Sequence, residues 1–301
     1  MNLRLGIAIK LVSLLLFAMM SVLVRYLGER VPLGQVVFFR SAFALLPIVA
    51  IYAWRGELAT AFRTRRPLGH ITRGCISVVG MFLNFASLAR LPLVDATAIS
   101  FASPFITVAL AALILKEHVR AYRWGAVAAG FAGVMVMLWP YLNFGALAAA
   151  SSTITVGAAC AVTAAFANSG SVIQTRRLTD SETTSSIVFY FSLICALAGL
   201  ATAPFGWNAP SAGELAALIG IGICGGLGHI VLTESYRFAP ASLIAPFDYT
   251  SMLWALVVGY LAFGELPTAL GFLGAAIIVG AGLFVIWRER QLGKARGEPF
   301  S

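Results

Sequence analysis

The sequence predicts an all-α integral membrane protein with ten transmembrane helices, arranged as two inverted five-helix repeats. Three observations lead to this fold class. The 301-residue chain is 60% hydrophobic and only 11% charged. Its apolar runs are long enough for helices to cross a hydrocarbon layer about 30 Å thick. The second half of the chain also repeats the residue layout of the first half, which indicates an internal repeat.

The composition makes lipid the main solvent of the side chains. A soluble domain usually carries about 25% charged residues, and no soluble interior could bury this much apolar surface. The net charge of +9 does not indicate nucleic-acid binding, because the basic residues are dispersed among apolar runs. The four cysteines have neither metal-ligand nor disulfide spacing. No metal and no cofactor is therefore expected.

Apolar blocks separated by short polar breaks give the candidate spans. Their continuous apolar character is typical of helices rather than of the alternating strands of an outer-membrane barrel. The spans cover residues 5–27, 34–54, 69–89, 92–116, 121–139, 152–176, 183–203, 212–236, 241–264 and 268–287. The first span resembles a signal peptide, but no small-residue cleavage site precedes Arg25, so we expect it to be retained.

The distribution of Lys and Arg predicts the orientation, because these residues are retained on the cytoplasmic side. With the N-terminus inside, most of the 21 basic residues fall in cytoplasmic segments. Only Arg25, Arg30 and Arg90 fall outside, and Arg40 lies within a span. We therefore expect a multi-pass protein of the bacterial inner membrane with both termini in the cytoplasm. Membrane lipids are then its partners, nucleic acid is not, and residues 288–301 form a basic cytoplasmic tail.

The internal repeat covers the whole chain. A shift of roughly 148 residues places Glu117 on Glu265 and Phe101 on Tyr249, and a shift near 151 aligns the first two spans of each half. Five spans per half is an odd number, so the halves enter the membrane in opposite directions. We expect the repeats at 1–140 and 152–287. Inverted repeats place a substrate site near mid-membrane between them and allow alternating access.

A motif pattern within each half resembles a known family. The motif residues are Pro92, Asp95, Ala96, Lys116, Glu117, Trp124, Gly125, Gly130 and Gly133, with Gly264, Glu265 and Pro267 in the second copy. This pattern is similar to that of the drug/metabolite transporter superfamily, and most of all to its ten-span EamA-type branch.

The resemblance implies a secondary transporter, not an enzyme, that exports small metabolites. Within the family, the sequence most resembles bacterial inner-membrane exporters of aromatic and other neutral amino acids. It implies a central cavity lined by spans 1, 3, 4, 6, 8 and 9. The four-span multidrug relatives use a carboxylate in their first span for proton antiport. The first span here has no carboxylate, so that mechanism is not expected.

Polar groups and rings near mid-membrane on these spans are the candidate substrate-binding residues. A mostly apolar pocket with few polar groups suits a small amphiphile such as a hydrophobic amino acid. The candidates are Ser77, Asn84, Phe85, Ser100, Phe101, Ser103, Asn168, Tyr249 and Trp254. Phe101 and Tyr249 are favoured because they are repeat-equivalent. Pro104 and Pro246 can kink the spans that carry them.

Three ionisable residues on presumed cavity helices lie at one depth. Lys10, His229 and Asp248 are each about 10 Å or less from the cytoplasmic surface at about 1.5 Å per residue. Ionisable groups in the bilayer need partners or water. We interpret the three as an inner gate or coupling site, with a purely structural polar contact as the alternative. Arg40 and Asp95, nearer the outer surface, could pair across helices.

Other functions stay open at this point. A multidrug or nucleoside exporter would have the same fold. An intramembrane serine hydrolase could use Ser169 and His229, although no complete GxSG motif is present. A channel would need a charge ring or filter-like loop, which the sequence does not show. No ATP-binding motif occurs, and ten spans can enclose a pathway within one monomer.

Overall fold

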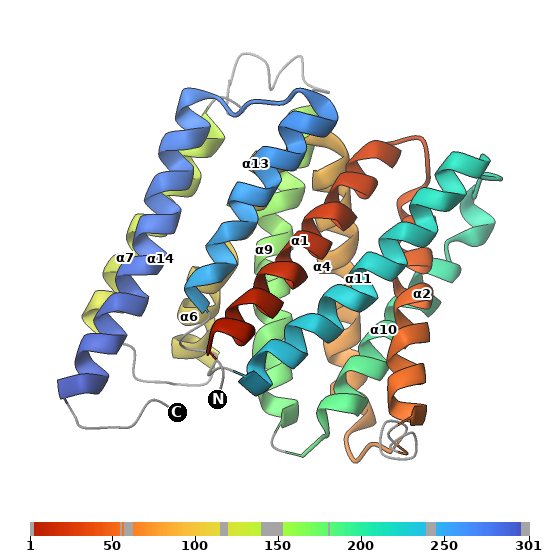
Figure 1. Cartoon of the computed structure of the whole chain (residues 1–301), viewed down its shortest axis with the longest axis horizontal. Coiled ribbons are helices and arrows are strands. Elements are labelled where there is room, and N and C mark those ends of the chain that lie inside the picture. The colour runs from red at the N-terminus through yellow and green to blue at the C-terminus, as the bar shows by residue number, and fades with distance from the viewer. Residues whose placement is uncertain are drawn as a thin grey trace.

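The protein is a bundle of long helices (Figure 1). The computed structural model describes residues 3–54, 56, 63–114, 120–139, 153–179, 181–238 and 245–295. Every regular element within these residues is a helix, so the all-α prediction is confirmed. Seven helices in the described part of the chain are long and apolar enough to cross a membrane, and two shorter apolar helices accompany them.

The helices follow the predicted spans in order. The first half contains α1 (Leu3–Leu27), α2 (Leu33–Trp54), α4 (Pro67–Arg90), α5 (Leu93–Ser100), α6 (Ala102–Ile114) and α7 (Ala121–Leu138). The second half contains α9 (Thr153–Thr179), α10 (Thr184–Leu200), the 3-10 turn η2 (Ala203–Phe205), α11 (Ala212–Phe238), the 3-10 turn η3 (Ala245–Tyr249), α13 (Thr250–Phe263) and α14 (Ala269–Ala295). Helix α14 continues beyond its predicted end into the segment expected to be a tail.

Local sequence signals explain where several helices begin and end. Pro67 occupies the first turn of α4, where its missing N–H would have no helical partner. Thr183 caps α10 by accepting a hydrogen bond from the Ser186 N–H at 3.2 Å. Gly264 ends α13 with φ of 67°, a left-handed conformation that favours glycine. These signals set the ends of the helices, and the closest packing is between helices that are not consecutive in the chain.

The fourth and ninth spans are both discontinuous, and their breaks fall at repeat-equivalent positions. Helix α5 ends at Ser100 and α6 begins at Ala102, so the break falls at Phe101. Pro104 contributes, because it lacks the N–H that would bond to the Ser100 carbonyl. In the second half η3 ends at Tyr249, the residue that aligns with Phe101, and α13 follows. Broken helices at such positions are typical of transporters with inverted repeats.

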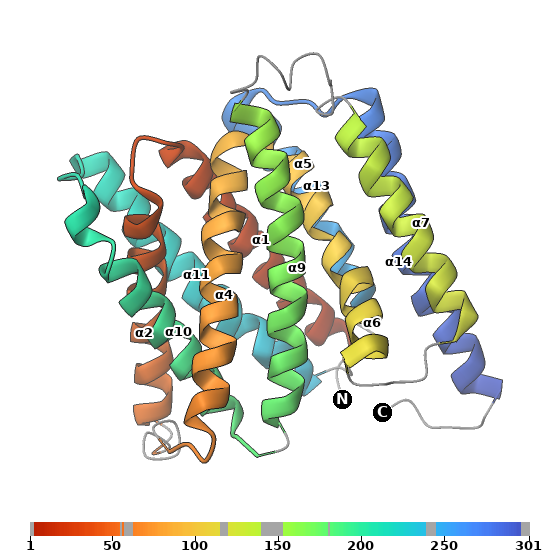
Figure 2. The same cartoon turned by 180° about the vertical axis from the view of Figure 1, so that it is seen from behind.

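Helix packing has the symmetry that inverted repeats require. Helix α1 packs mainly against α11, and the repeat-equivalent pair α9 and α4 packs in the same way. Helices α7 and α14 pair with each other along one edge of the bundle, as do α2 and α10 at the opposite edge (Figures 1 and 2). Helices α1 and α9 run in opposite directions, and α1 begins at the end of the bundle where α14 finishes.

Glycines allow close backbone approach on the α2 side of the bundle. A Cβ atom added at Gly199 of α10 would lie only 2.6 Å from the Phe38 nitrogen of α2 and 2.8 Å from the Gly34 carbonyl oxygen. A Cβ atom at Gly222 of α11 would lie 2.8 Å from the Phe39 carbonyl oxygen. Small residues stabilise helix contacts in lipid by this close approach. The helices α2, α10 and α11 therefore form a tightly packed group.

Candidate functional site

Three cavities between the described helices hold most of the predicted site residues. We call the first the basic cavity, defined by Arg40, Arg73, Ser77, Asn84, Asn168, Phe191 and His229, with a volume of about 380 Å³. We call the second the aromatic cavity, defined by Phe101, Pro104, Asp248, Tyr249 and Gly282, with a volume of about 220 Å³. The third, about 150 Å³, lies among α1, α4, α5 and α13 and includes Asn84 and Ser100.

The basic cavity is lined by both halves of the chain. Helices α1, α2 and α4 contribute from the first half, and α9, α10 and α11 from the second. This differs from the expected lining, because spans 2 and 7 take part while spans 4 and 9 do not. The predicted residues Ser77, Asn84, Phe85 and Asn168 all line it. The hydroxyls of Ser77 and Ser171 lie 2.6 Å apart and share a hydrogen bond between α4 and α9.

Arg40 is the residue that sequence reasoning placed wrongly. It does not pair with Asp95; its Nη2 atom donates to Nε2 of His229 at 3.0 Å. A guanidinium group can only donate, so the His229 Nε2 atom accepts and carries no proton. Arg40 is only 5% exposed, and its buried Nε and Nη1 atoms have no hydrogen-bond partner among the described residues.

Arg73 brings a second cation to the same cavity. Its Nε atom donates to the Thr175 hydroxyl at 2.6 Å, and its Nη1 atom donates to the Ile187 carbonyl at 2.8 Å. The guanidinium carbons of Arg73 and Arg40 lie 5.0 Å and 5.6 Å from the centre of the Phe191 ring, within the range of cation–π attraction. No Asp or Glu is among the described residues that line this cavity.

The aromatic cavity lies beside the two helix breaks. The rings of Phe101 and Tyr249 are 5.0 Å apart between centroids. The Tyr249 hydroxyl sits over Gly282 of α14, where a Cβ atom would have no room. Helix α7 contributes Arg123 to the lining. The two favoured repeat-equivalent aromatics therefore contact each other, but they do so outside the basic cavity.

The remaining candidates are distributed elsewhere. Ser100 lines the third cavity and donates to the Thr97 carbonyl at 2.6 Å. The Ser103 hydroxyl lies 3.0 Å from the Ser169 hydroxyl, and joins α6 to α9. Trp254 lines none of the three cavities. The buried Trp254 Nε1 atom finds no hydrogen-bond partner within the described ranges. The predicted set does not form one cluster.

The proposed inner cluster is divided in the structure. The Lys10 ammonium lies 2.7 Å from the Asp248 carboxylate, so these two residues meet as expected. His229 instead lines the basic cavity, where its ring and that of Phe17 make an edge-to-face contact. Ser169, the candidate nucleophile of the hydrolase alternative, bonds to Ser103 and to the Ala165 carbonyl. Among the described residues, Ser169 bonds to Ser103 and Ala165 whereas His229 bonds to Arg40, so these contacts do not join the two residues.

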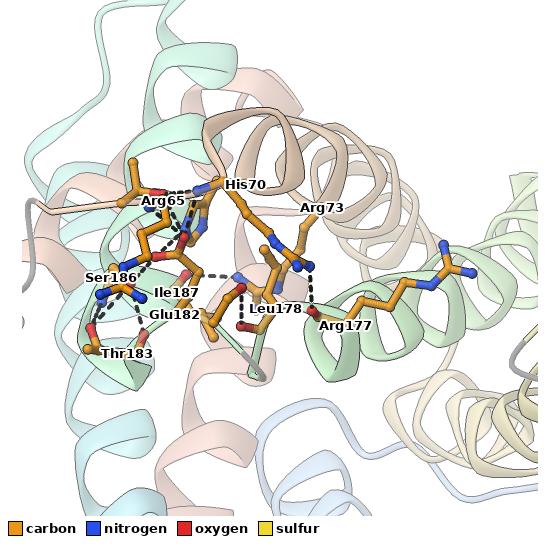
Figure 3. Close-up of polar contacts among 12 residues, drawn as sticks. Arg65, His70, Arg73, Arg177, Leu178, Glu182, Thr183, Ser186 and Ile187 are labelled. Atoms are coloured by element: carbon orange, nitrogen blue, oxygen red, sulfur yellow. Dashed lines mark hydrogen bonds and ion pairs between the residues drawn. The ribbon is translucent and has the colours of Figure 1, made fainter.

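A polar network around Glu182 ties α4 to α10 at one end of the bundle (Figure 3). The Glu182 Oε1 atom accepts from the N–H groups of Arg65 and Arg66, both at 2.7 Å, and from the Thr64 hydroxyl at 3.0 Å. His70 lies 3.5 Å from Oε2. Burial alone would raise the pKa of Glu182, but these hydrogen bonds outweigh it and hold the pKa below its usual value.

A second polar network joins helices at the opposite end of the bundle. Arg25 of α1 donates to Glu265 at 2.7 Å and to the Ala89 carbonyl at 2.8 Å. The other carboxylate oxygen of Glu265 accepts from the Leu93 N–H at 3.1 Å. This places the motif residue Glu265 between α1 and the start of α5. Sequence reasoning identified the motif but not its partner, because Arg25 comes from another span.

Comparisons with known proteins agree with this architecture. The model of the EamA-like transporter family matches residues 4–139 and 155–287. A solved crystal structure aligns with a TM-score of 0.63 and 20% identity, covering 92% of this chain and 95% of the other. That likeness supports the fold.

Relatives of known name cover nearly the whole chain. The S-adenosylmethionine uptake transporter of Rickettsia prowazekii (strain Madrid E) is 30% identical over 97% of this chain and 96% of its own. The riboflavin transporter of Rhizobium johnstonii is 30% identical over 91% and 88%. The pseudopaline exporter CntI of Pseudomonas aeruginosa is 28% identical over 93% and 95%. These names do not include an amino-acid exporter. With both repeats matched by one family model, the chain belongs to the EamA-like transporter family and is a multi-pass membrane transporter.

Proposed function

We propose that this chain is a secondary transporter that moves a small metabolite by alternating access, with the basic cavity as its substrate site. The observation that carries the proposal is that one cavity takes its walls from both inverted halves. A tilt of one half against the other would change which end of such a cavity is open. The amides and hydroxyls of Asn84, Asn168 and Ser77 would orient the substrate within it.

The substrate that the sequence suggests is an aromatic or other neutral amino acid, moved outward. The names of the relatives widen the field to S-adenosylmethionine and riboflavin. Uptake transporters and an exporter both occur among them. The direction of a secondary transporter follows the gradients on its substrate and coupling ions, so one cavity would serve either direction.

The arrangement in the membrane is part of the proposal. Two repeats at 1–140 and 152–287 would enter the bilayer in opposite directions, with both termini and the basic segment 288–301 in the cytoplasm. The Glu182 network joins the residues before α4 to those between α9 and α10, and α4 begins and α9 finishes at the end of the bundle where α1 begins (Figures 1 and 2). Basic residues such as Arg65 and Arg66 favour the cytoplasmic side. Labelling of a cysteine-free chain carrying Arg63→Cys or Arg30→Cys with an impermeant maleimide tests this, and only the Arg30→Cys variant should react from outside.

Counterflow into proteoliposomes tests the function. The full chain is reconstituted, and the liposomes are preloaded with one unlabelled compound from a panel of amino acids, nucleosides, cationic drugs, S-adenosylmethionine and riboflavin. At least one class should show saturable exchange that empty liposomes lack, and Asn84→Ala should weaken it while Thr163→Ala, on the exposed face of α9, should not. Non-saturable flux would indicate a channel. Labelling of Ser169 by a fluorophosphonate without any exchange would favour a hydrolase.

A further inference from the structure

We infer that the metabolite carried in the basic cavity bears an anionic group, a carboxylate, phosphate or sulfonate, which binds to Arg40 and Arg73. The inference deepens the proposed function and rests on it for movement across the membrane. Binding of the anion can be tested separately. Four features of the described residues lead to it.

The first feature is that Arg40 is a buried cation without a counter-charge among the described residues. Its side chain is 5% exposed, and its Nε and Nη1 atoms find no hydrogen-bond partner in the part of the chain that the structure describes. Its one described polar contact is the neutral ring of His229. Burying a charge is costly unless the charge is paired and hydrogen-bonded. An anionic ligand would supply the missing acceptors.

The second feature is the contrast with other cations of the bundle. Lys10 lies 2.7 Å from Asp248, Arg25 lies 2.7 Å from Glu265, and Arg90 lies 2.7 Å from Glu29. Each of these cations has a carboxylate from another part of the chain. The described lining of the basic cavity supplies none. Arg40 and Arg73 therefore differ from these three cations in what neutralises them.

The third feature is that the two arginines converge. Both guanidinium groups lie within 6 Å of the centre of the same ring, Phe191. Planar guanidinium groups bind carboxylate and phosphate oxygens through paired hydrogen bonds. His229 fixes one end of Arg40, and Thr175 with the Ile187 carbonyl fixes Arg73. The cations are thus held in place before a ligand arrives, which reduces the entropy lost on binding.

The fourth feature is what surrounds the charges. Phe85 and Phe191 provide aromatic faces, and Asn84, Asn168 and Ser77 provide neutral polar groups. The cavity volume of about 380 Å³ is in the range of small-molecule sites. An organic anion with a flat or apolar body would use both parts of this lining. An inorganic ion alone would leave the aromatic part empty.

Ligand-induced thermal stability of the purified full chain tests the inference with matched pairs of probes. Each pair has the same body with and without the charge: indole-3-acetate and indole-3-acetamide, N-acetyl-L-phenylalanine and its amide, riboflavin 5′-phosphate and riboflavin. At least one anion should raise the unfolding midpoint, and its neutral partner should need about tenfold to a hundredfold more concentration, as expected for a hydrogen bond to a charged group.

Variants identify the groups responsible. Arg40→Gln and Arg73→Gln should each remove the preference for the anion, and Arg40→Lys should restore part of it. Arg90→Gln is the matched control, because it removes a cation that has its own carboxylate and lies outside the cavity; it should keep the preference. If Arg40→Gln does not fold, Arg73→Gln and Arg40→Lys carry the test.

The outcomes separate the two proposals. Equal stabilisation by acid and amide, no stabilisation by any probe, or a preference that survives both glutamine variants would overturn the inference. The same probes are then used as competitors in counterflow. Exchange without a charge preference would leave the transport function standing and reject the anion site. Anion binding without any exchange would support the site and count against transport.

Discussion

The basic cavity and the aromatic cavity differ in what surrounds them as much as in what lines them. The basic cavity is bordered by α2, α10 and α11, whose backbones approach closely through Gly199 and Gly222. The aromatic cavity is bordered by the broken spans and by the α7–α14 pair. On α14, a Cβ atom at Gly280 would meet nothing within 4 Å. Close backbone approach is not confined to the basic cavity, because a Cβ atom at Gly133 of α7 would lie 2.9 Å from the Gly274 carbonyl oxygen of α14. The aromatic cavity differs in that it adjoins two broken spans, whereas the basic cavity is lined by unbroken helices.

This difference separates two requirements of a transporter. A binding site has to hold charged groups in fixed positions, which dense packing and the hydrogen bonds of Arg73 provide. A change of access needs helices that can bend or move, which broken spans at Phe101 and Tyr249 allow. The predictions below test whether the two regions differ in this way, beginning with the largest expected effect.

The α2–α10 contact should not tolerate a larger residue at Gly199. Gly199→Ala forces a Cβ atom against the backbone of Phe38, so we expect a loss of about 3 kcal/mol in the free energy of unfolding. Gly280→Ala is the matched control and should be close to neutral, because the added atom meets open space. Thermal unfolding in detergent measures both. Equal losses for the two variants would mean that the close approach at Gly199 is not what stabilises the α2–α10 contact.

In the Lys10–Asp248 ion pair beside the aromatic cavity, removal of one partner should cost more stability than removal of the other. The Lys10 side chain is 2% exposed, whereas that of Asp248 is 44% exposed. Asp248→Asn leaves a buried cation, and we expect it to cost about 2 kcal/mol. Lys10→Met leaves a carboxylate that water can reach, so the cost should be smaller. A larger loss in Lys10→Met than in Asp248→Asn would contradict this account of the pair.

The Glu182 network gives a pH-dependent prediction. The folded-state pKa of Glu182 is lowered, so its contribution is present above the unfolded-state pKa and is lost as pH falls through the folded-state pKa. Glu182→Gln should cost about 1 kcal/mol near neutral pH. The difference from the parent chain should shrink in acid, which unfolding midpoints measured from neutral to acidic pH would show. If the difference in unfolding midpoint between Glu182→Gln and the parent chain stayed constant down to the lowest pH measured, the charge of Glu182 would not be what stabilises the network.

The smallest effect is expected from Tyr249→Phe. The ring contact with Phe101 is kept and only the hydroxyl over Gly282 is lost, so stability should change by about 0.5 kcal/mol or less. The variant should retain the same preference for anionic over neutral probes, because it lies outside the basic cavity. A lost preference in Tyr249→Phe would mean that the two cavities act as one site.

Hydropathy predicted where the helices lie along the chain, because about twenty consecutive apolar residues have few alternatives to a membrane helix. Against the ten predicted spans, seven of the described helices are long and apolar enough to cross a membrane, and two are shorter. The repeat alignment placed Phe101 on Tyr249, where the structure breaks both helices. The cluster of Lys10, His229 and Asp248 was less predictable. The depth of a residue in the membrane follows from the rise per residue along its helix. The direction in which its side chain points around the helix axis cannot be predicted in this way. His229 was predicted at the same depth as Asp248, but it lines a different cavity.

The place of Arg40 in the cavity was not predicted, for a different reason. The resemblance to the family excluded its span from the cavity, and that exclusion outweighed the physical signal of a charge in the bilayer. The repeat alignment also pointed to the neighbour of Arg40. The shift of about 151 residues that aligns the first two spans of each half also places Arg40 on Phe191, and these two residues are in contact in the structure.

That contact has a consequence for the origin of the site. If each half were a separate, identical subunit, the two equivalent positions would hold the same residue, giving either two facing arginines or two facing rings. Joining the halves in one polypeptide lets one position keep a cation while its mirror-related position becomes a ring. A substrate bound in such an asymmetric cavity would fit in only one orientation, which two identical subunits could not impose.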